Sequence, residues 1–169
     1  MKSKPLLIFS LLIIMAAIVV VYYLIGFSGQ AGIPELRILL GQEKCHRCGM
    51  IISDIRYAAA IYVGGGVNEW WKYDDVGEMA LDYFEKKDSY EFLAVRVYDF
   101  LTGEEVDGYK AWYVVADPKE LWTPMGYGVI AFKDRADAEK VAEEHNGVIM
   151  DWNKLIETIP NIKPVMAKP

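Results

Sequence analysis

The segment 44-KCHRCGMIISD-54 concentrates the side chains of this sequence that are best suited to bind a metal. It holds the chain's two cysteines, Cys45 and Cys48, and Met50 follows closely. Thiolates and thioethers are soft ligands that favour Cu(I) over harder ions. A turn carrying these three side chains could present an accessible site for a delivered ion, so the segment favours copper.

A further soft ligand is expected from 123-TPMGYGVIAF-132, where Met125 lies between Pro124 and Gly126 at the start of an expected strand. Met79 and Met150 instead belong to periodic apolar runs, which is typical of methionines that pack in a core. We therefore take Met125, and not these two, as a candidate ligand.

Other uses of a C-x-x-C pair are less well supported. Haem attachment requires a histidine directly after the second cysteine, and that position holds Gly49. A structural zinc site normally needs two pairs of nitrogen or sulfur ligands, so His46 and His145 would have to supply the second pair. A zinc-stabilised or disulfide-stabilised docking domain remains an alternative.

A thiol–disulfide oxidoreductase is the alternative enzyme. Such enzymes place C-x-x-C at a helix N-terminus, where the thiol pKa is lowered. Here Gly49 and Met50 lead into Ile51 and Ile52, which indicates a turn before an apolar segment. An oxidising compartment would still allow the two thiols to form a bridge.

The N-terminus contains an expected membrane anchor. Residues 6–27 include no charged side chain, and a helix of this length spans about 33 Å, enough for a hydrocarbon core of about 30 Å. Lys2 and Lys4 precede it, so the positive-inside rule places the N-terminus in the cytoplasm and residues 28–169 outside. A cleaved signal peptide is the alternative, although residues 29–31 form only a weak cleavage site.

The charge of the chain excludes some classes of partner. Its net charge is −6, and because residues 1–27 contribute +2, the external part carries −8. An acidic external part argues against binding to nucleic acid or to anionic lipid. With 53% apolar and 25% charged residues, the composition is that of a globular protein.

The elements expected after a linker at 28–43 form two passages of similar order. The first has strands at 57–63, 69–73 and 91–100, with a helix to about Phe84 between the last two. Asp74 and Asp75 are expected to cap that helix. The second passage has strands at 109–115, 127–132 and 148–152, with a helix from Asp134 to about His145.

These passages predict an α+β domain at 44–159, built from two strand–strand–helix–strand repeats at about 44–100 and 101–157. Residues 71–75 align with 130–134, and residues 60–62 align with 111–113. Residues 160–169 are expected to form a loose tail.

Four segments resemble the NosL family, the copper-binding accessory proteins of nitrous-oxide reductase maturation. They match the family's Cys-Gly-Met, aromatic-Asp-Asp, middle-strand and Pro-Met-Gly motifs in the same order. In this chain the four segments are 45-CHRCGM-50, 73-YDDVGEM-79, 97-VYDFLTG-103 and 124-PMGYGVIAF-132.

The resemblance implies a membrane-tethered, extracytoplasmic protein without enzymatic turnover, which binds one Cu(I) and passes it toward nitrous-oxide reductase. It also implies two ββαβ repeats similar to a domain of organomercurial lyase. Cys48, Met50 and Met125 match the family's ligand motifs, Cys45 belongs to a C-x-x-C variant, and His46 is a possible nitrogen ligand. Typical members are lipoproteins, whereas this chain has an expected transmembrane helix, and C-x-x-C members could serve another cuproenzyme, such as an oxidase.

Overall fold

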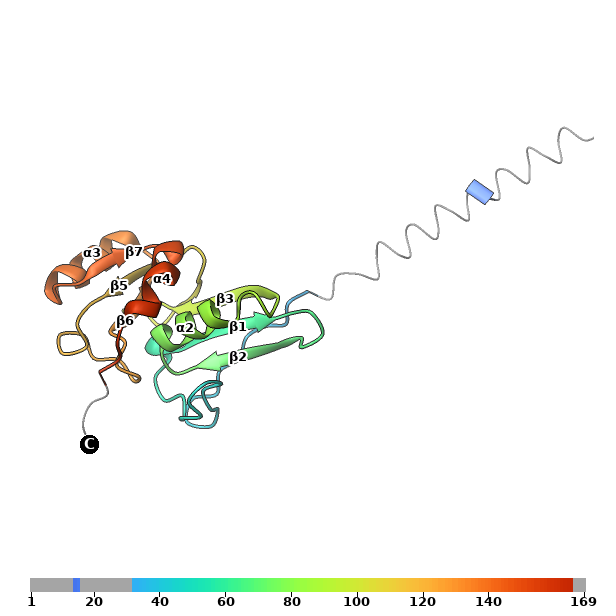
Figure 1. The fold of residues 1–169 in the computed structure, drawn as a ribbon, viewed down its shortest axis with the longest axis horizontal. Coiled ribbons are helices and arrows are strands. Elements are labelled where there is room, and N and C mark those ends of the chain that lie inside the picture. The colour runs from blue at the N-terminus through green and yellow to red at the C-terminus, as the bar shows by residue number, and fades with distance from the viewer. Residues whose placement is uncertain (1–13, 16–31, 166–169) are drawn as a thin grey trace, which may run out of the picture. The chain divides into compact units, whose positions relative to one another are not determined.

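The computed structural model describes residues 14–15 and 32–165 (Figure 1). The chain divides into two units, 1–34 and 35–169, and the fold given below is that of the second. Apart from Ile14 and Met15, the expected membrane anchor lies outside the described residues. Within the described part of the chain, no helix has both the length and the apolar character needed to cross a bilayer.

The first sheet has four antiparallel strands in the order β2-β1-β3-β4. Figure 1 labels β1, β2 and β3 of this sheet. They are β1 (Ala59–Val63), β2 (Glu69–Tyr73), β3 (Phe92–Tyr98) and β4 (Glu105–Asp107). Helix α2 (Val76–Lys86) follows β2 in the chain. Every residue of β1 is buried, because this strand lies between two others and is covered on its faces.

The second sheet has three antiparallel strands in the order β6-β5-β7. They are β5 (Trp112–Val115), β6 (Val129–Phe132) and β7 (Val148–Met150), and α3 (Arg135–Glu144) follows β6. Each sheet therefore contains a strand–strand–helix–strand unit whose first strand lies between the other two, and β4 adds a fourth strand to the first sheet. The prediction of a mixed α+β fold is confirmed.

The alignment predicted for the first strands of the two repeats is wrong by two residues. Ala59 pairs with Tyr73, and Trp112 pairs with Phe132. Tyr73 and Phe132 each lie two residues before the N-cap of the following helix, so Ala59 corresponds to Trp112. A shift of two keeps every side chain on the same face, which is why the apolar pattern did not reveal it.

The C-terminal region differs from its prediction. The expected strand ends at Met150, and Asp151 caps a helix, α4 (Trp152–Thr158), by accepting a hydrogen bond from the Lys154 N–H. A 3-10 turn, η2 (Ile159–Asn161), follows. The Val165 N–H then donates to the Gly126 carbonyl at 2.9 Å, so residues 160–165 are not a loose tail. Another 3-10 turn, η1 (Ile55–Tyr57), precedes β1.

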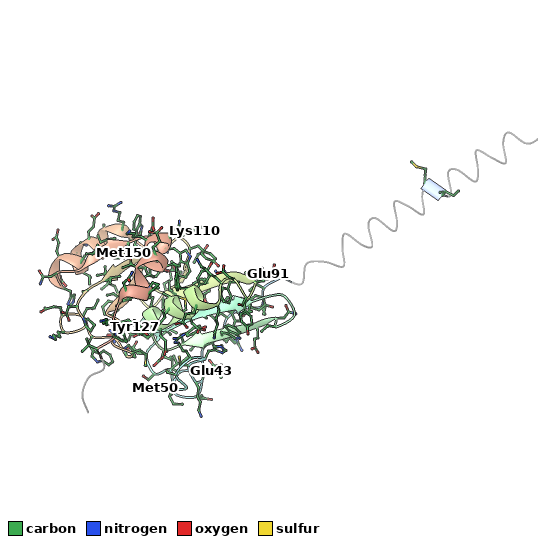
Figure 2. The ribbon with its side chains drawn as sticks, viewed as in Figure 1. Glu43, Met50, Glu91, Lys110, Tyr127 and Met150 are labelled. Carbon is green, nitrogen blue, oxygen red and sulfur yellow. The ribbon has the colours of Figure 1, made fainter. Side chains whose placement is uncertain are left out.

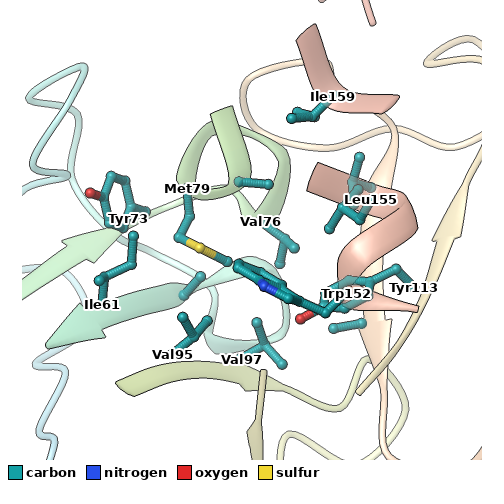
Figure 3. Packing of buried hydrophobic residues seen from close by; sticks show 14 of the residues in the cluster. Ile61, Tyr73, Val76, Met79, Val95, Val97, Tyr113, Trp152, Leu155 and Ile159 are labelled. Carbon is teal, nitrogen blue, oxygen red and sulfur yellow. The ribbon is translucent and has the colours of Figure 1, made fainter. Parts of the chain in front are cut away.

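One core joins the elements of both sheets. Figure 3 shows Met79 of α2 beside side chains of β1 and β3, with Trp152 and Leu155 of α4 on the opposite side. Met79 is fully buried and Met150 packs at the edge of the same cluster, which confirms their packing role. Beyond β3, the Phe100 N–H donates to the Ala131 carbonyl in β6, so the sheets are also linked through the backbone.

Candidate metal site

The two cysteines lie in a tight turn that has no helical structure. Lys44 and Ile51 form an isolated antiparallel bridge across it, and the Cys45 N–H donates to the Met50 carbonyl at 2.7 Å. The Gly49 N–H donates to the Cys45 carbonyl at 3.0 Å. Gly49 has φ +75°, a left-handed conformation that favours glycine, so the turn itself explains the Gly after the second cysteine.

The two thiols are free and differ in exposure. Cys45 is 3% exposed and Cys48 is half-buried. Burial raises the pKa of Cys45 well above its usual value, and it raises the pKa of Cys48 to about 11 although the Met50 N–H lowers it. Exchange enzymes need a lowered thiol pKa. The position and the pKa of these cysteines therefore argue against the oxidoreductase.

Two buried carboxylates complete a four-residue group around the thiols. The Cys45 thiol donates to Glu78 Oε2 at 2.9 Å, and the Cys48 thiol donates to Asp74 Oδ1 at 3.5 Å. Asp74 and Glu78 are 4% and 3% exposed. One ligand atom from each of the four residues lies within 4.8 Å of the others, so the group could hold a metal ion.

Neighbouring aspartates at the start of α2 have different roles. Asp75 accepts hydrogen bonds from the N–H groups of Gly77 and Glu78, which confirms it as the N-cap. The same cap was predicted for Asp74, and this is wrong, because the Asp74 carboxylate faces Cys48. Glu78 has the spacing of a capping box with Asp75, yet its side chain contacts Cys45. Burial raises the Glu78 pKa.

The Pro-Met-Gly loop lies on the first turn of α2. The Met125 N–H donates to Asp75 Oδ2 at 2.9 Å. Tyr127, labelled in Figure 2, packs so closely on Gly77 that a Cβ atom at position 77 would overlap it. Met125 is half-buried against the cluster that contains Cys45. The backbone of Met125, a predicted ligand, is thus hydrogen-bonded to the residue that directly follows Asp74.

Met50 and the two histidines lie differently. The Met50 side chain, labelled in Figure 2, is 50% exposed. Its carbonyl accepts the hydrogen bond from the Cys45 N–H across the same turn. His46 stacks on Trp71 with 4.1 Å between ring centroids. His145 Nδ1 lies 2.7 Å from the Glu120 carbonyl. Neither histidine belongs to the four-residue group. The side chains that accompany the two cysteines in this group are carboxylates and not the histidine pair that a structural zinc site would have required.

The fold and the site together define an α+β domain with a candidate metal site made of two thiols and two carboxylates. The sequence matches the NosL family over residues 38–159, and the chain belongs to this family. The resemblance seen in its four motifs is thereby confirmed. A search of curated proteins finds no match.

The structure is similar to the crystal structure of the copper chaperone NosL from Shewanella denitrificans. The TM-score is 0.62 at 17% sequence identity, and the match covers 73% of this chain and 96% of that one. At this level of identity the likeness shows a shared fold.

Proposed function

We propose that this protein is a membrane-tethered, extracytoplasmic Cu(I) metallochaperone that has no enzymatic turnover. The observation that carries the proposal is the pair of free thiols in one turn, with Cys45 buried and Cys48 half-buried. Two thiolates held close together bind Cu(I) well, and a partly open turn allows the ion to enter and leave. Membership of a family with a copper chaperone among its structures supports this function.

In this proposal Cys45 and Cys48 supply thiolates, and Met50 and Met125 supply thioethers. The position of the loop supports Met125 as a ligand, because the Met125 N–H donates a hydrogen bond to Asp75, next to the thiol-containing group. Met50 follows Cys48 by two residues, and its exposed side chain is free to turn toward an ion at the surface. His46 is kept as a possible additional ligand.

The proposed recipient is nitrous-oxide reductase, its maturation machinery or a related cuproenzyme. The uncharged segment 6–27 would anchor the chain with its N-terminus in the cytoplasm and the domain in the periplasm or outside the cell. The net charge of −8 outside the anchor favours a neutral or basic contact surface on the recipient.

A Cu(I) competition titration of the full-length chain in detergent, reduced and anaerobic, tests the proposal. We expect one equivalent of tightly bound Cu(I). Loss of groups that only orient a ligand costs about 10- to 100-fold in affinity, so Cys48→Ser should cost at least about 100-fold. His145→Ala, whose ring contacts a backbone carbonyl, serves as the control and should bind as the wild type does.

The absence of Cu(I) binding by the fully reduced chain would refute the proposal. Reduction of a model disulfide, lost in both Cys45→Ser and Cys48→Ser, would instead identify a thiol–disulfide oxidoreductase.

A further inference from the structure

The open edge of the second sheet has no part in the proposed function. Strand β7 pairs with β5 on one side, and among the residues that the structure describes no other backbone segment is hydrogen-bonded to it. Val148, its first residue, is 59% exposed. The backbone N–H and C=O groups on the free side of such a strand can pair with another chain. A short edge strand is common by itself, but this one borders a groove.

The groove has a volume of about 570 Å³ and lies between β7 and α3. Its α3 side carries Glu139, Ala142 and Glu143, which have the i, i+3, i+4 spacing of one helix face. Ile149 of β7 lines the groove and packs on the apolar cluster that includes Ala142. Figure 1 shows α3 and β7 side by side. An open strand edge can bind an extended peptide, because the edge supplies backbone hydrogen bonds while pockets beside it receive alternate side chains.

The charge of the groove indicates which kind of segment fits it. The charged residues that line it are Glu139 and Glu143, and both are exposed. Glu139 pairs with Arg135 at 2.9 Å, whereas Glu143 forms no ion pair within residues 32–165. Four residues of a helix rise about 6 Å, and two residues of a strand span about 6.6–6.8 Å. Two basic residues separated by one position on an added strand therefore match the spacing of the two glutamates.

We propose that the free edge of β7 and the groove beside α3 form a docking site for an extended basic segment of another protein, which adds to the sheet as a strand. Every second side chain of that segment points toward α3, where lysine or arginine meets Glu139 and Glu143. Figure 2 labels Met150 of β7 and Met50 of the cysteine turn, which lie well apart, so a docked segment leaves the thiols accessible. The inference depends on the second sheet and α3 alone, and it goes beyond the copper function.

Fluorescence anisotropy with a labelled peptide tests the docking site. The probe is acetyl-Lys-Val-Lys-Val-Lys-Val-amide, titrated with the full-length chain in nonionic detergent at about 0.1 M salt. We expect saturable binding, and Glu143→Lys should weaken it at least about tenfold because it brings like charges together. Glu144→Lys is the matched control: it changes the net charge equally, on an exposed residue of the same helix that does not line the groove. Its affinity should stay within about twofold of wild type, since salt screens distant charges.

Two N-methylated peptides test whether the segment binds as a strand. One carries the methyl groups on the valine nitrogens and the other on the lysine nitrogens of the backbone. Neighbouring residues of a strand direct their N–H groups to opposite sides. One modified peptide should therefore lose its hydrogen bonds to β7 and bind at least about tenfold more weakly, and the other should bind as the parent does.

Each contrary result would overturn the proposal. The wild-type chain would have to leave the parent peptide unbound, or Glu143→Lys and Glu144→Lys would have to lose equal affinity, which would show that binding follows net charge. Equal binding of the two methylated peptides would exclude strand addition. Sedimentation analysis addresses the other occupant: dimers that the parent peptide dissociates would assign the edge to a second copy of the chain. The Cu(I) titration enters none of these outcomes, so the copper proposal can fail while this one stands.

Discussion

The Arg47 guanidinium donates a hydrogen bond to the Asp82 carboxylate at 2.8 Å and so ties the cysteine turn to α2. Arg47 stands between Cys45 and Cys48 in the sequence, and Asp82 lies one turn after Glu78 in the helix. Arg47 also pairs with Glu85. The thiols and the carboxylates of the candidate site are therefore held together by a contact outside the site itself.

Arg47→Met should destabilise the domain and weaken Cu(I) binding. The substitution removes charged hydrogen bonds to an aspartate whose side chain is 1% exposed, and the expected loss is about 1–3 kcal/mol in the free energy of unfolding. Urea denaturation and the Cu(I) titration measure the two effects.

The control for Arg47 is Arg135→Met, which removes an exposed pair with Glu139 and a cation–π contact with Trp112 and should cost at most about 1 kcal/mol. Equal effects of the two arginine variants would show that the Arg47–Asp82 contact does not stabilise the turn.

Asp82 should make the stability of the protein depend on pH under acidic conditions. Burial alone would raise its pKa, but hydrogen bonds from Lys86, Tyr73 and Arg47 outweigh burial and hold the pKa below its usual value. A lowered pKa stabilises the fold above the unfolded-state value of about 3.9, and this stability is lost as pH falls through the folded-state pKa.

Asp82→Asn should accordingly be less stable at neutral pH and lose less stability below about pH 4. Unfolding free energies from pH 7 to pH 2 measure this, with the exposed Asp88→Asn as control. A parallel pH profile for wild type and Asp82→Asn would contradict the role given to this aspartate.

Met125→Leu should weaken Cu(I) binding while the protein remains folded, since leucine keeps the apolar volume but lacks the sulfur. We expect a loss of about tenfold in affinity, equivalent to about 1.4 kcal/mol. Met150→Leu, also half-buried, is the matched control. A Met125→Leu chain that binds Cu(I) as tightly as wild type would remove Met125 from the site.

Gly126→Ala should disturb the loop that carries Met125. Gly126 has φ +69°, and a Cβ atom there would overlap the backbone of Val165. Gly103→Ala provides the comparison, because Gly103 has φ +72° but its nearest neighbour would lie at 3.5 Å. The left-handed conformation costs about 1–2 kcal/mol in both variants, and overlap should add about 1–3 kcal/mol at position 126 alone. Thermal and urea unfolding would show whether the two differ.

Most of the fold could be predicted because its signals are local. The alternation of apolar residues indicated the strands, and Asp75 indicated the start of α2. Helix α4 was missed because Val148 to Trp152 continues an apolar run, although Asp151 is a capping residue that marks the boundary. The alignment of the repeats was off by two because that shift preserves the inward and outward faces.

The site could be predicted only in part, for a physical reason. Thiols and thioethers are recognisable by residue type, whereas Asp74 and Glu78 resemble ordinary residues of a helix start. Their contacts with the cysteines span 26 and 33 residues along the chain. Only the folded arrangement of the turn against α2 brings them together.

The unequal exposure of Cys45 and Cys48 sets an order of events for any transfer of a bound ion. An incoming ligand from a recipient can approach on the side of Cys48, while Cys45 is shielded by the core. Cys48 would be exchanged first and Cys45 would release the ion last, so that the ion stays bound throughout the hand-over. In the proposed hand-over, a single buried anchor would thus prevent release of the free ion into solution.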